Sequence, residues 1–225
     1  MPHHEYVTSL LYKKKTPLGF SLALSASLGI INSIFVLGWI LDIKWLIDPF
    51  TSESPTKLIA AISFVCVSII ILSLSYDNNA RPPLLTLIHI AVTMLFIHIL
   101  AIIIFGFVTQ INTGAEFIFT KNSSNTSFSD ILVQKQSIGT AFSFSLICAI
   151  AIQAISGKSN YKFSMLIVGN ILCLIGLTAV TGYIIGVPVL YFDIQGVSSP
   201  MSIYTGVSLI VSGAAMLASG RIGDH

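Results

Sequence analysis

Six long apolar runs, separated by short polar segments, occupy most of this chain of 225 residues. Each run is at least as long as the roughly 18 residues that a helix needs to cross about 30 Å of hydrocarbon. Unpaired backbone groups are not tolerated in lipid, so continuous runs of this length predict helices and not barrel strands. The sequence therefore predicts an all-α, polytopic membrane protein with six transmembrane helices. The predicted spans are Leu18–Leu41, Pro55–Ser75, Pro83–Val108, Ser137–Ile155, Phe163–Val187 and Ser199–Ser219.

The composition supports the lipid bilayer as the surroundings of the chain. Hydrophobic residues make up 54% of it and charged residues 9%, whereas about 25% of the residues of a soluble domain are charged. A net charge of +2 gives no sign of a nucleic-acid partner. The three cysteines all lie inside apolar runs without metal-ligand spacing, so we expect neither a disulfide framework nor a metal site.

The first 17 residues form a basic segment that includes Lys13, Lys14 and Lys15. A basic cluster before an apolar stretch is typical of a secretory signal, but this apolar run continues to Leu41, beyond the length of a signal-peptide core. We therefore expect the first helix to be retained. The predicted organisation is a cytoplasmic N-terminal segment (1–17), a transmembrane domain (18–221) and a cytoplasmic tail (222–225).

Lysine and arginine are in excess on the cytoplasmic side of most membrane proteins. The predicted spans place seven of these residues on one side of the membrane and four on the other, so both termini are predicted to be cytoplasmic. The seven are Lys13, Lys14, Lys15, Arg81, Lys158, Lys162 and Arg221, and the four are Lys44, Lys57, Lys121 and Lys135.

A short pattern recurs where the second, fourth and sixth spans re-enter the membrane. Ser54-Pro55 and Ser199-Pro200 suit a helix start, with serine as the N-cap and proline in the first turn. Aligning these pairs matches Ala60 with Thr205, and the fourth span continues the pattern at Thr140. The pattern predicts three repeated helical hairpins, at about 18–76, 83–156 and 163–220. The alternative is chance recurrence of common membrane-boundary residues.

Small residues recur along three spans and predict helix-packing faces, because small side chains let helix backbones approach in lipid. One face has Thr205, Ser208, Ser212, Ala215 and Ser219. The other two have Ser21, Ser25, Gly29 and Ser33, and Ala141, Ser145, Ala149 and Gln153.

Polar side chains within a span are costly and are therefore candidate binding residues. Four stand out: Asn32, His89, His98 and Asn170. His89 and His98 are nine residues apart, so they point to opposite helix faces and cannot bind one haem iron together. A homodimer could still supply a second ligand, and His98 could alternatively ligate alone, contact a quinone or sense protons. Hydrogen bonding between helices, for instance to Asn32 or Asn170, is the simpler interpretation.

No nucleotide-binding or hydrolase motif is present, and no acidic residue lies at the middle of a span. We therefore expect neither enzymatic activity nor a bound cofactor, and the missing charge weakens ion-coupled transport.

Two short motifs carry a resemblance to a known family. The first motif, in the C-terminal third of the chain, consists of Gly182, Tyr183, Ile185, Gly186, Pro188, Leu190, Tyr191, Pro200, Met201, Thr205, Ser208 and Arg221. The second consists of Thr140, Ala141 and Phe144. With these motifs the chain resembles a bacterial membrane input domain, as found ahead of PAS, histidine-kinase or diguanylate-cyclase modules in sensor proteins. The resemblance covers about 18–221 and implies a multi-pass sensor module of the bacterial inner membrane.

The sequence ends at "RIGDH" without an output module, so the expected function is signal input through a separate partner protein or a homodimer, unless the chain is a fragment. A small transporter or channel is the first alternative. A haem- or quinone-binding redox protein is the second.

Overall fold

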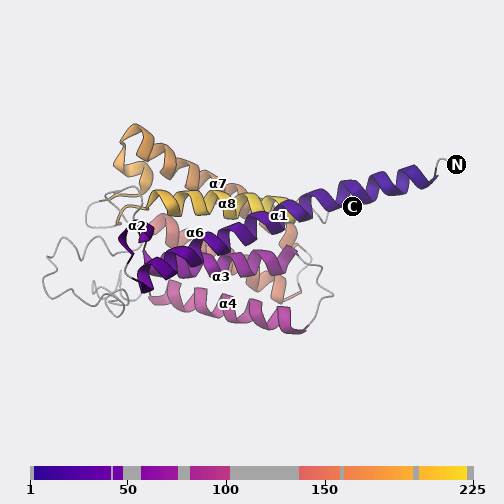
Figure 1. Ribbon diagram of the computed structural model, residues 1–225, viewed down its shortest axis with the longest axis horizontal. Coiled ribbons are helices and arrows are strands. Elements are labelled where there is room, and N and C mark those ends of the chain that lie inside the picture. Colours follow the sequence, from indigo (N-terminus) through magenta and orange to yellow (C-terminus); the bar gives the residue numbers. More distant parts are fainter. Residues whose placement is uncertain are drawn as a thin grey trace, which may run out of the picture.

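The computed structural model describes residues 3–41, 43–47, 57–75, 82–101, 137–157, 160–194 and 198–221. These residues are almost entirely helical, as predicted, and Figure 1 shows the helices packed side by side along one direction. The long helices are α1 (His3–Ile40), α3 (Leu58–Ser75), α4 (Pro82–Ala101), α6 (Ile138–Ile155), α7 (Tyr161–Ile185) and α8 (Ile203–Gly220). The shorter elements are α2 (Lys44–Ile47) and the 3-10 helix η2 (Pro188–Tyr191).

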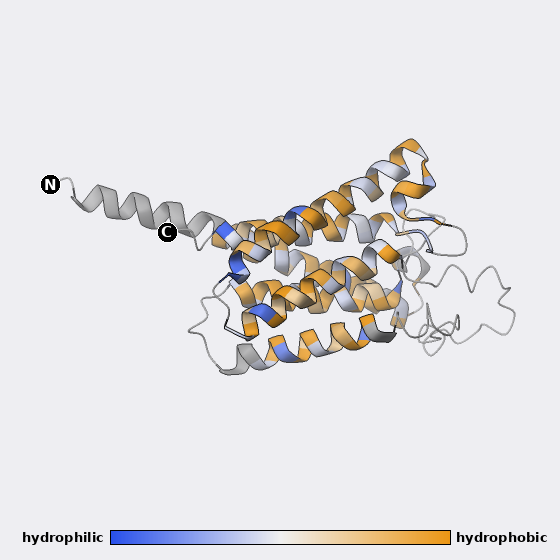
Figure 2. Ribbon diagram, turned by 180° about the vertical axis from the view of Figure 1, so that it is seen from behind, coloured by the Kyte–Doolittle hydropathy of each residue, from blue (hydrophilic) through white to orange (hydrophobic). Residues whose placement is uncertain are grey.

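Five of these helices are long and apolar enough to cross a membrane, which confirms five of the six predicted spans closely. The remaining predicted span, the third along the chain, corresponds to α4. This helix has an apolar stretch at Thr86–Ile99 within the described residues, and the end of the predicted span, 102–108, lies outside them. Large apolar side chains are exposed on all six long helices, although only Ile62 on α3 and only Val207 on α8 are among them. Figure 2 shows that hydrophobic residues predominate along the helices. A surface of this kind is suited to lipid contact.

The long helices form a closed ring in chain order, since each packs against the next and α8 packs against α1. α3 additionally contacts α6 and α8 across the ring. In the membrane-spanning parts, 72% of the residues of α3 and 56% of those of α8 are buried, against 28% for α1 and 33% for α7. Of the five candidate spans, α3 and α8 are therefore the most deeply buried in the bundle.

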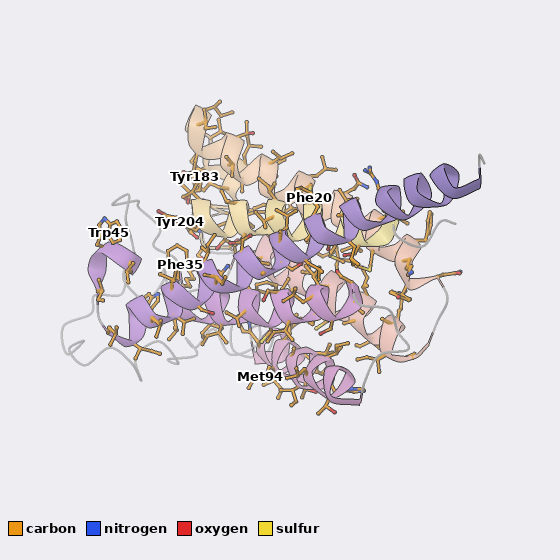
Figure 3. All side chains as sticks on the ribbon, turned by 45° about the vertical axis from the view of Figure 1, so that its right-hand side comes forward. Phe20, Phe35, Trp45, Met94, Tyr183 and Tyr204 are labelled. Atoms are coloured by element: carbon orange, nitrogen blue, oxygen red, sulfur yellow. The ribbon has the colours of Figure 1, made fainter. Side chains whose placement is uncertain are left out.

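Successive helices run in opposite directions, so α1 begins and α8 ends at the same end of the bundle (Figure 1). That end is called the inner end below, and the end where α3, α6 and α8 begin is called the outer end. Tyr183 and Trp45 both lie toward the outer end (Figure 3). Tyr183 stacks on Tyr191 at 4.3 Å between ring centroids, and its hydroxyl donates to the carbonyl of Met201.

The start of α8 differs from the sequence prediction. Its N-cap is Ser202, whose side chain accepts a hydrogen bond from the amide of Thr205 at 3.2 Å, and not Ser199. Pro200 therefore precedes the helix instead of lying in its first turn. The reason is that Ser198 and Ser199 are engaged elsewhere, as the next section describes. Ser54-Pro55 lies outside the described residues.

One of the three predicted packing faces is confirmed. All five residues of the α8 face are buried. On α1 the buried positions after Ser25 are Leu28, Asn32, Phe35 and Gly38, while Ser33 is exposed. A strict four-residue repeat drifts around a helix of 3.6 residues per turn, so the predicted face rotates out of the contact.

The predicted face of α6 is not the buried face of that helix, since none of its four residues is buried. Ala149 is exposed, and the buried face contains Ser143, Phe144, Ile147 and Cys148.

Three serines join α1, α3 and α8 near the inner end. Ser21, Ser75 and Ser219 are buried, and each hydroxyl oxygen lies 2.5 to 3.0 Å from the other two. Hydroxyl groups buried away from water need such partners. The serine triad therefore ties three helices together without a charge.

Candidate functional site

The two intramembrane asparagines lie apart from each other. Asn32 on α1 is buried, with 1% of its surface exposed, and its side-chain amide donates to the carbonyl of Leu28 in the same helix. Asn170 on α7 is exposed on the bundle surface and donates to the carbonyl of Leu166. Each amide thus donates within its own helix, and the hydrogen-bond partner of His98 is a different residue.

His98 makes the interhelical hydrogen bond expected of it, but with a different partner. Its Nδ1 bonds to the hydroxyl of Ser63 on α3, and its ring lies 6.0 Å from the ring of Phe144 on α6. Ser63 also donates to the carbonyl of Ile59 at 2.9 Å, so its oxygen accepts from His98. His98 thus connects α4 to the inner helices.

His89 lies on an exposed part of α4, away from the face that carries His98. The four predicted site residues are consequently not brought together into one site. Among the described residues, no group of three or more His, Cys, Asp or Glu side chains is arranged to hold a metal ion.

A polar cavity lies instead at the outer end, where α3, α6 and α8 begin. It has about 200 Å³ of empty space, its solvent-filled mouth included, of which about 10 Å³ admits the centre of a water-sized sphere. That is room for about one water-sized guest. The described residues lining it are Lys57, Ala60, Ser137, Thr140, Pro200, Met201, Ser202 and Thr205.

Lys57 brings a positive charge to this cavity. It immediately precedes α3, only 8% of its surface is exposed, and its ammonium group donates to the hydroxyl of Ser199 at 2.7 Å. Charged side chains are rarely buried to this degree unless the surroundings stabilise the charge. The sequence interpretation had counted Lys57 only as an outer-side cation.

Ser137 contributes a hydroxyl without a partner. It is the N-cap residue of α6, yet its side chain makes no capping hydrogen bond. Only 2% of Ser137 is exposed, and its buried Oγ has no hydrogen-bond partner in the described part of the chain. A buried hydroxyl left unsatisfied costs roughly 1 to 3 kcal/mol, so a missing partner at this position is an informative feature.

The segment before α8 supplies the cap that Ser137 does not. The hydroxyl of Ser198 accepts from the amide of Ile138, the first residue of α6, at 3.1 Å. The side chains of Ser202 and Thr205 bond to each other at 2.9 Å. Residues far apart in the chain thus build one polar wall at the outer end.

The cavity closes toward the middle of the bundle. Phe64 and Phe144, one turn further along α3 and α6 than Ala60 and Thr140, are both almost fully buried. Their rings are in edge contact at 5.1 Å, and Leu209 on α8 is buried at the corresponding depth. The polar region is therefore a closed-ended recess.

Helix N-termini carry partial positive charge from their unpaired amides, equivalent to about half an elementary charge each. Three of them meet here beside Lys57 and a group of hydroxyls. Such an arrangement can hold a small polar group. In the sequence, a lysine placed directly before an apolar run was the signal that could have pointed here.

Fold and surface define a multi-pass α-helical membrane protein with a polar recess at one end. The chain matches no protein-family model, no curated protein and no solved structure.

Proposed function

We propose that the chain is a membrane-embedded sensory module that receives a small polar ligand at the outer recess and signals to a partner protein in the cytosol. The proposal includes six membrane spans arranged as three repeated hairpins, with both termini cytoplasmic. The resemblance to bacterial sensor input domains motivates it, and membership of that family is part of the proposal.

The observation that carries the proposal is the lining of the recess. The sequence alignment that equates Ala60, Thr140 and Thr205 also equates the residues three positions earlier, and all six line the cavity. Equivalent positions of three related units approach one axis when the units pack around it. The earlier set of residues is Lys57, Ser137 and Ser202.

The closed inner side of the recess favours a receptor over a channel. Phe64 and Phe144 fill the axis below it, and the apolar core continues from there along α3 and α6. A pathway for solute would require these rings to move, whereas ligand binding requires only the existing recess. A small transporter remains the second candidate, and the polar recess is the observation that favours it.

α1 provides a physical route for a signal. It is one helix of 38 residues, about 57 Å long, and so exceeds the roughly 30 Å hydrocarbon core. Its membrane-spanning part begins at Leu18, which leaves the helical segment His3–Pro17 beyond the inner end. α1 packs against α3 and α8, two of the helices that line the recess, so a shift of these helices can be carried along α1 to this segment, where a partner would bind.

The test places a photo-crosslinking amino acid at Tyr12 in native membranes and identifies adducts by mass spectrometry. We expect a protein with a cytoplasmic signalling output domain. The matched control has the same amino acid at Phe20, which is 56% exposed on the apolar surface and should give lipid adducts only.

Adducts at Tyr12 without any output-domain protein would contradict the sensory proposal. Solute flux in proteoliposomes would then favour the transporter. A haem absorption band or a bound quinone in the purified protein would favour the redox alternative.

A further inference from the structure

One face of α7 is exposed along most of the helix. α7 packs against α8 and α6 at the edge of the bundle (Figure 1), and only 33% of the residues in its membrane-spanning part are buried. On its exposed face, residues recur at alternating steps of three and four along the chain. We call this face the α7 seam, and it consists of Ile167, Asn170, Leu174, Leu177, Thr181 and Ile184.

The spacing of the α7 seam is that of a helix pair. Steps of three and four average 3.5 residues, the repeat with which two helices wind around each other in a left-handed coiled coil. Most helices within membranes cross with this hand. Lipid suits the apolar members of the seam equally well, so the polar member decides whether a partner is needed.

Asn170 is a member of the seam that lipid does not suit. It lies nine residues from the start of α7, about 14 Å along the helix and thus within the hydrocarbon core. Its side-chain amide donates to the carbonyl of Leu166 at 2.8 Å, which uses one of its two N–H groups. Among the described residues, its second N–H and its side-chain oxygen have no partner. Unpaired polar groups are costly in hydrocarbon, so Asn170 indicates that another molecule covers this face.

A second copy of the chain provides the missing partner by symmetry. All copies insert into the membrane with the same orientation, so the α7 helices of two copies are parallel. Around a twofold axis along the membrane normal, each seam residue meets its own equivalent, and Asn170 therefore meets Asn170. An amide both donates and accepts, so two of them can form a reciprocal pair of hydrogen bonds. A different protein would need a matching polar group at the same depth.

We propose that the chain forms a parallel, twofold-symmetric dimer in the membrane through the α7 seam, with the Asn170 amides of the two copies hydrogen-bonded to each other. A single asparagine in a seam of this spacing also fixes the register of the two helices. The dimer goes beyond the sensory function and does not depend on it, so the crosslinking test at Tyr12 and the tests below can fail separately.

Disulfide crosslinking tests which face meets its copy. Leu174 is 62% exposed and lies about one turn from Asn170, so Leu174→Cys should give a disulfide-linked dimer when native membranes are oxidised with copper phenanthroline. The matched control is Ile97→Cys, which is 59% exposed on α4 at a similar distance from the inner start of its helix. This control should stay monomeric, as should the wild type, because no native cysteine belongs to the α7 seam.

Energy transfer between labelled copies of the full chain in liposomes, measured at increasing lipid dilution, tests the asparagine pair. Asn170→Leu should weaken self-association about tenfold, because two hydrogen bonds between helices are lost. The fold should remain intact, since the described bond of this amide is within α7. The matched control is Thr93→Val, which removes another exposed polar group whose hydroxyl donates within its own helix, to the carbonyl of His89 on α4. It should associate like the wild type.

Equal crosslinking of Leu174→Cys and Ile97→Cys overturns the proposal, because random collision would then explain both. Self-association of Asn170→Leu at wild-type strength overturns the asparagine pair. A link from Leu174→Cys to a different protein alone would assign the face to that protein and also overturn the dimer. Helical circular dichroism verifies the fold of each variant, and the crosslink decides the question if Asn170→Leu does not fold.

Discussion

The close contact between α7 and α8 makes a quantitative prediction. A methyl group added at Gly213 would lie 2.5 Å from the carbonyl oxygen of Gly169 and 2.6 Å from the sulfur of Cys173. One added at Gly176 would lie 2.5 Å from the carbonyl oxygen of Gly206. The paired glycines are seven residues apart on each helix, so the backbones of two antiparallel helices meet at both points. Small residues at such contacts are what allows helices to associate in lipid.

Gly213→Ala should destabilise the bundle. Ordinary non-bonded contact is roughly 3.5 Å, so the helices must separate locally by about 1 Å, which forfeits a quarter to a half of the dispersion energy at the contact. Overpacking of this kind costs about 1 to 3 kcal/mol. Alanine in place of glycine returns up to about 1 kcal/mol of helix propensity, which must be subtracted.

Gly19→Ala separates the two effects. Gly19 lies in α1 with nothing within 4 Å of an added methyl group. This control therefore gains the helix propensity without the clash, and the difference between the two variants measures the clash alone. We expect Gly213→Ala to be less stable than Gly19→Ala by about 2 kcal/mol.

Reversible unfolding in mixed micelles, titrated with dodecyl sulfate and followed by helical circular dichroism, gives the free energies of unfolding. Gly176→Ala should repeat the loss at the second contact. Equal stability of Gly213→Ala and Gly19→Ala would refute the close packing of α7 on α8.

Three further predictions concern the polar contacts and the topology. Ser219→Ala removes one member of the serine triad and should lower the free energy of unfolding by about 1 kcal/mol in the same titration. A double-mutant cycle of Ser63→Ala and His98→Phe should give a coupling energy of about 1 kcal/mol, typical of hydrogen bonds between membrane helices, and zero coupling would contradict the bond. Alkaline phosphatase should be inactive when fused after Gly220 and active when fused after Ile47, and activity at both positions would contradict cytoplasmic termini.

The positions of the helices could be predicted from the sequence because one physical constraint dominates. A segment must remain apolar over the thickness of the bilayer, and runs of this kind are visible without any tertiary information. The predicted end of the fourth span, Ile155, agrees with the structure, and the start of the fifth differs by two residues. Which face of a helix is buried was predicted less well, because lipid and protein interior are both apolar and hydrophobicity does not distinguish them.

The start of α8 shows a different limit. Ser199-Pro200 is a good local signal for a helix start, yet the helix begins three residues later, with Ser202 as its cap. Ser199 instead accepts the hydrogen bond of Lys57, which is 142 positions away in the chain. A local rule weighs only neighbouring residues and takes no account of a contact with a lysine so far away in the chain.

The recess was not predicted from the sequence because depth within the membrane was the criterion for candidate residues. That criterion selects Asn32 and Asn170, each of whose side-chain amides donates to a carbonyl of its own helix. The recess lies at the ends of the spans, where hydroxyl groups and a lysine are unremarkable in sequence. If the three hairpins are repeats, however, matching positions at three helix starts must face a common axis. A proposed repeat therefore predicts where a shared site can lie.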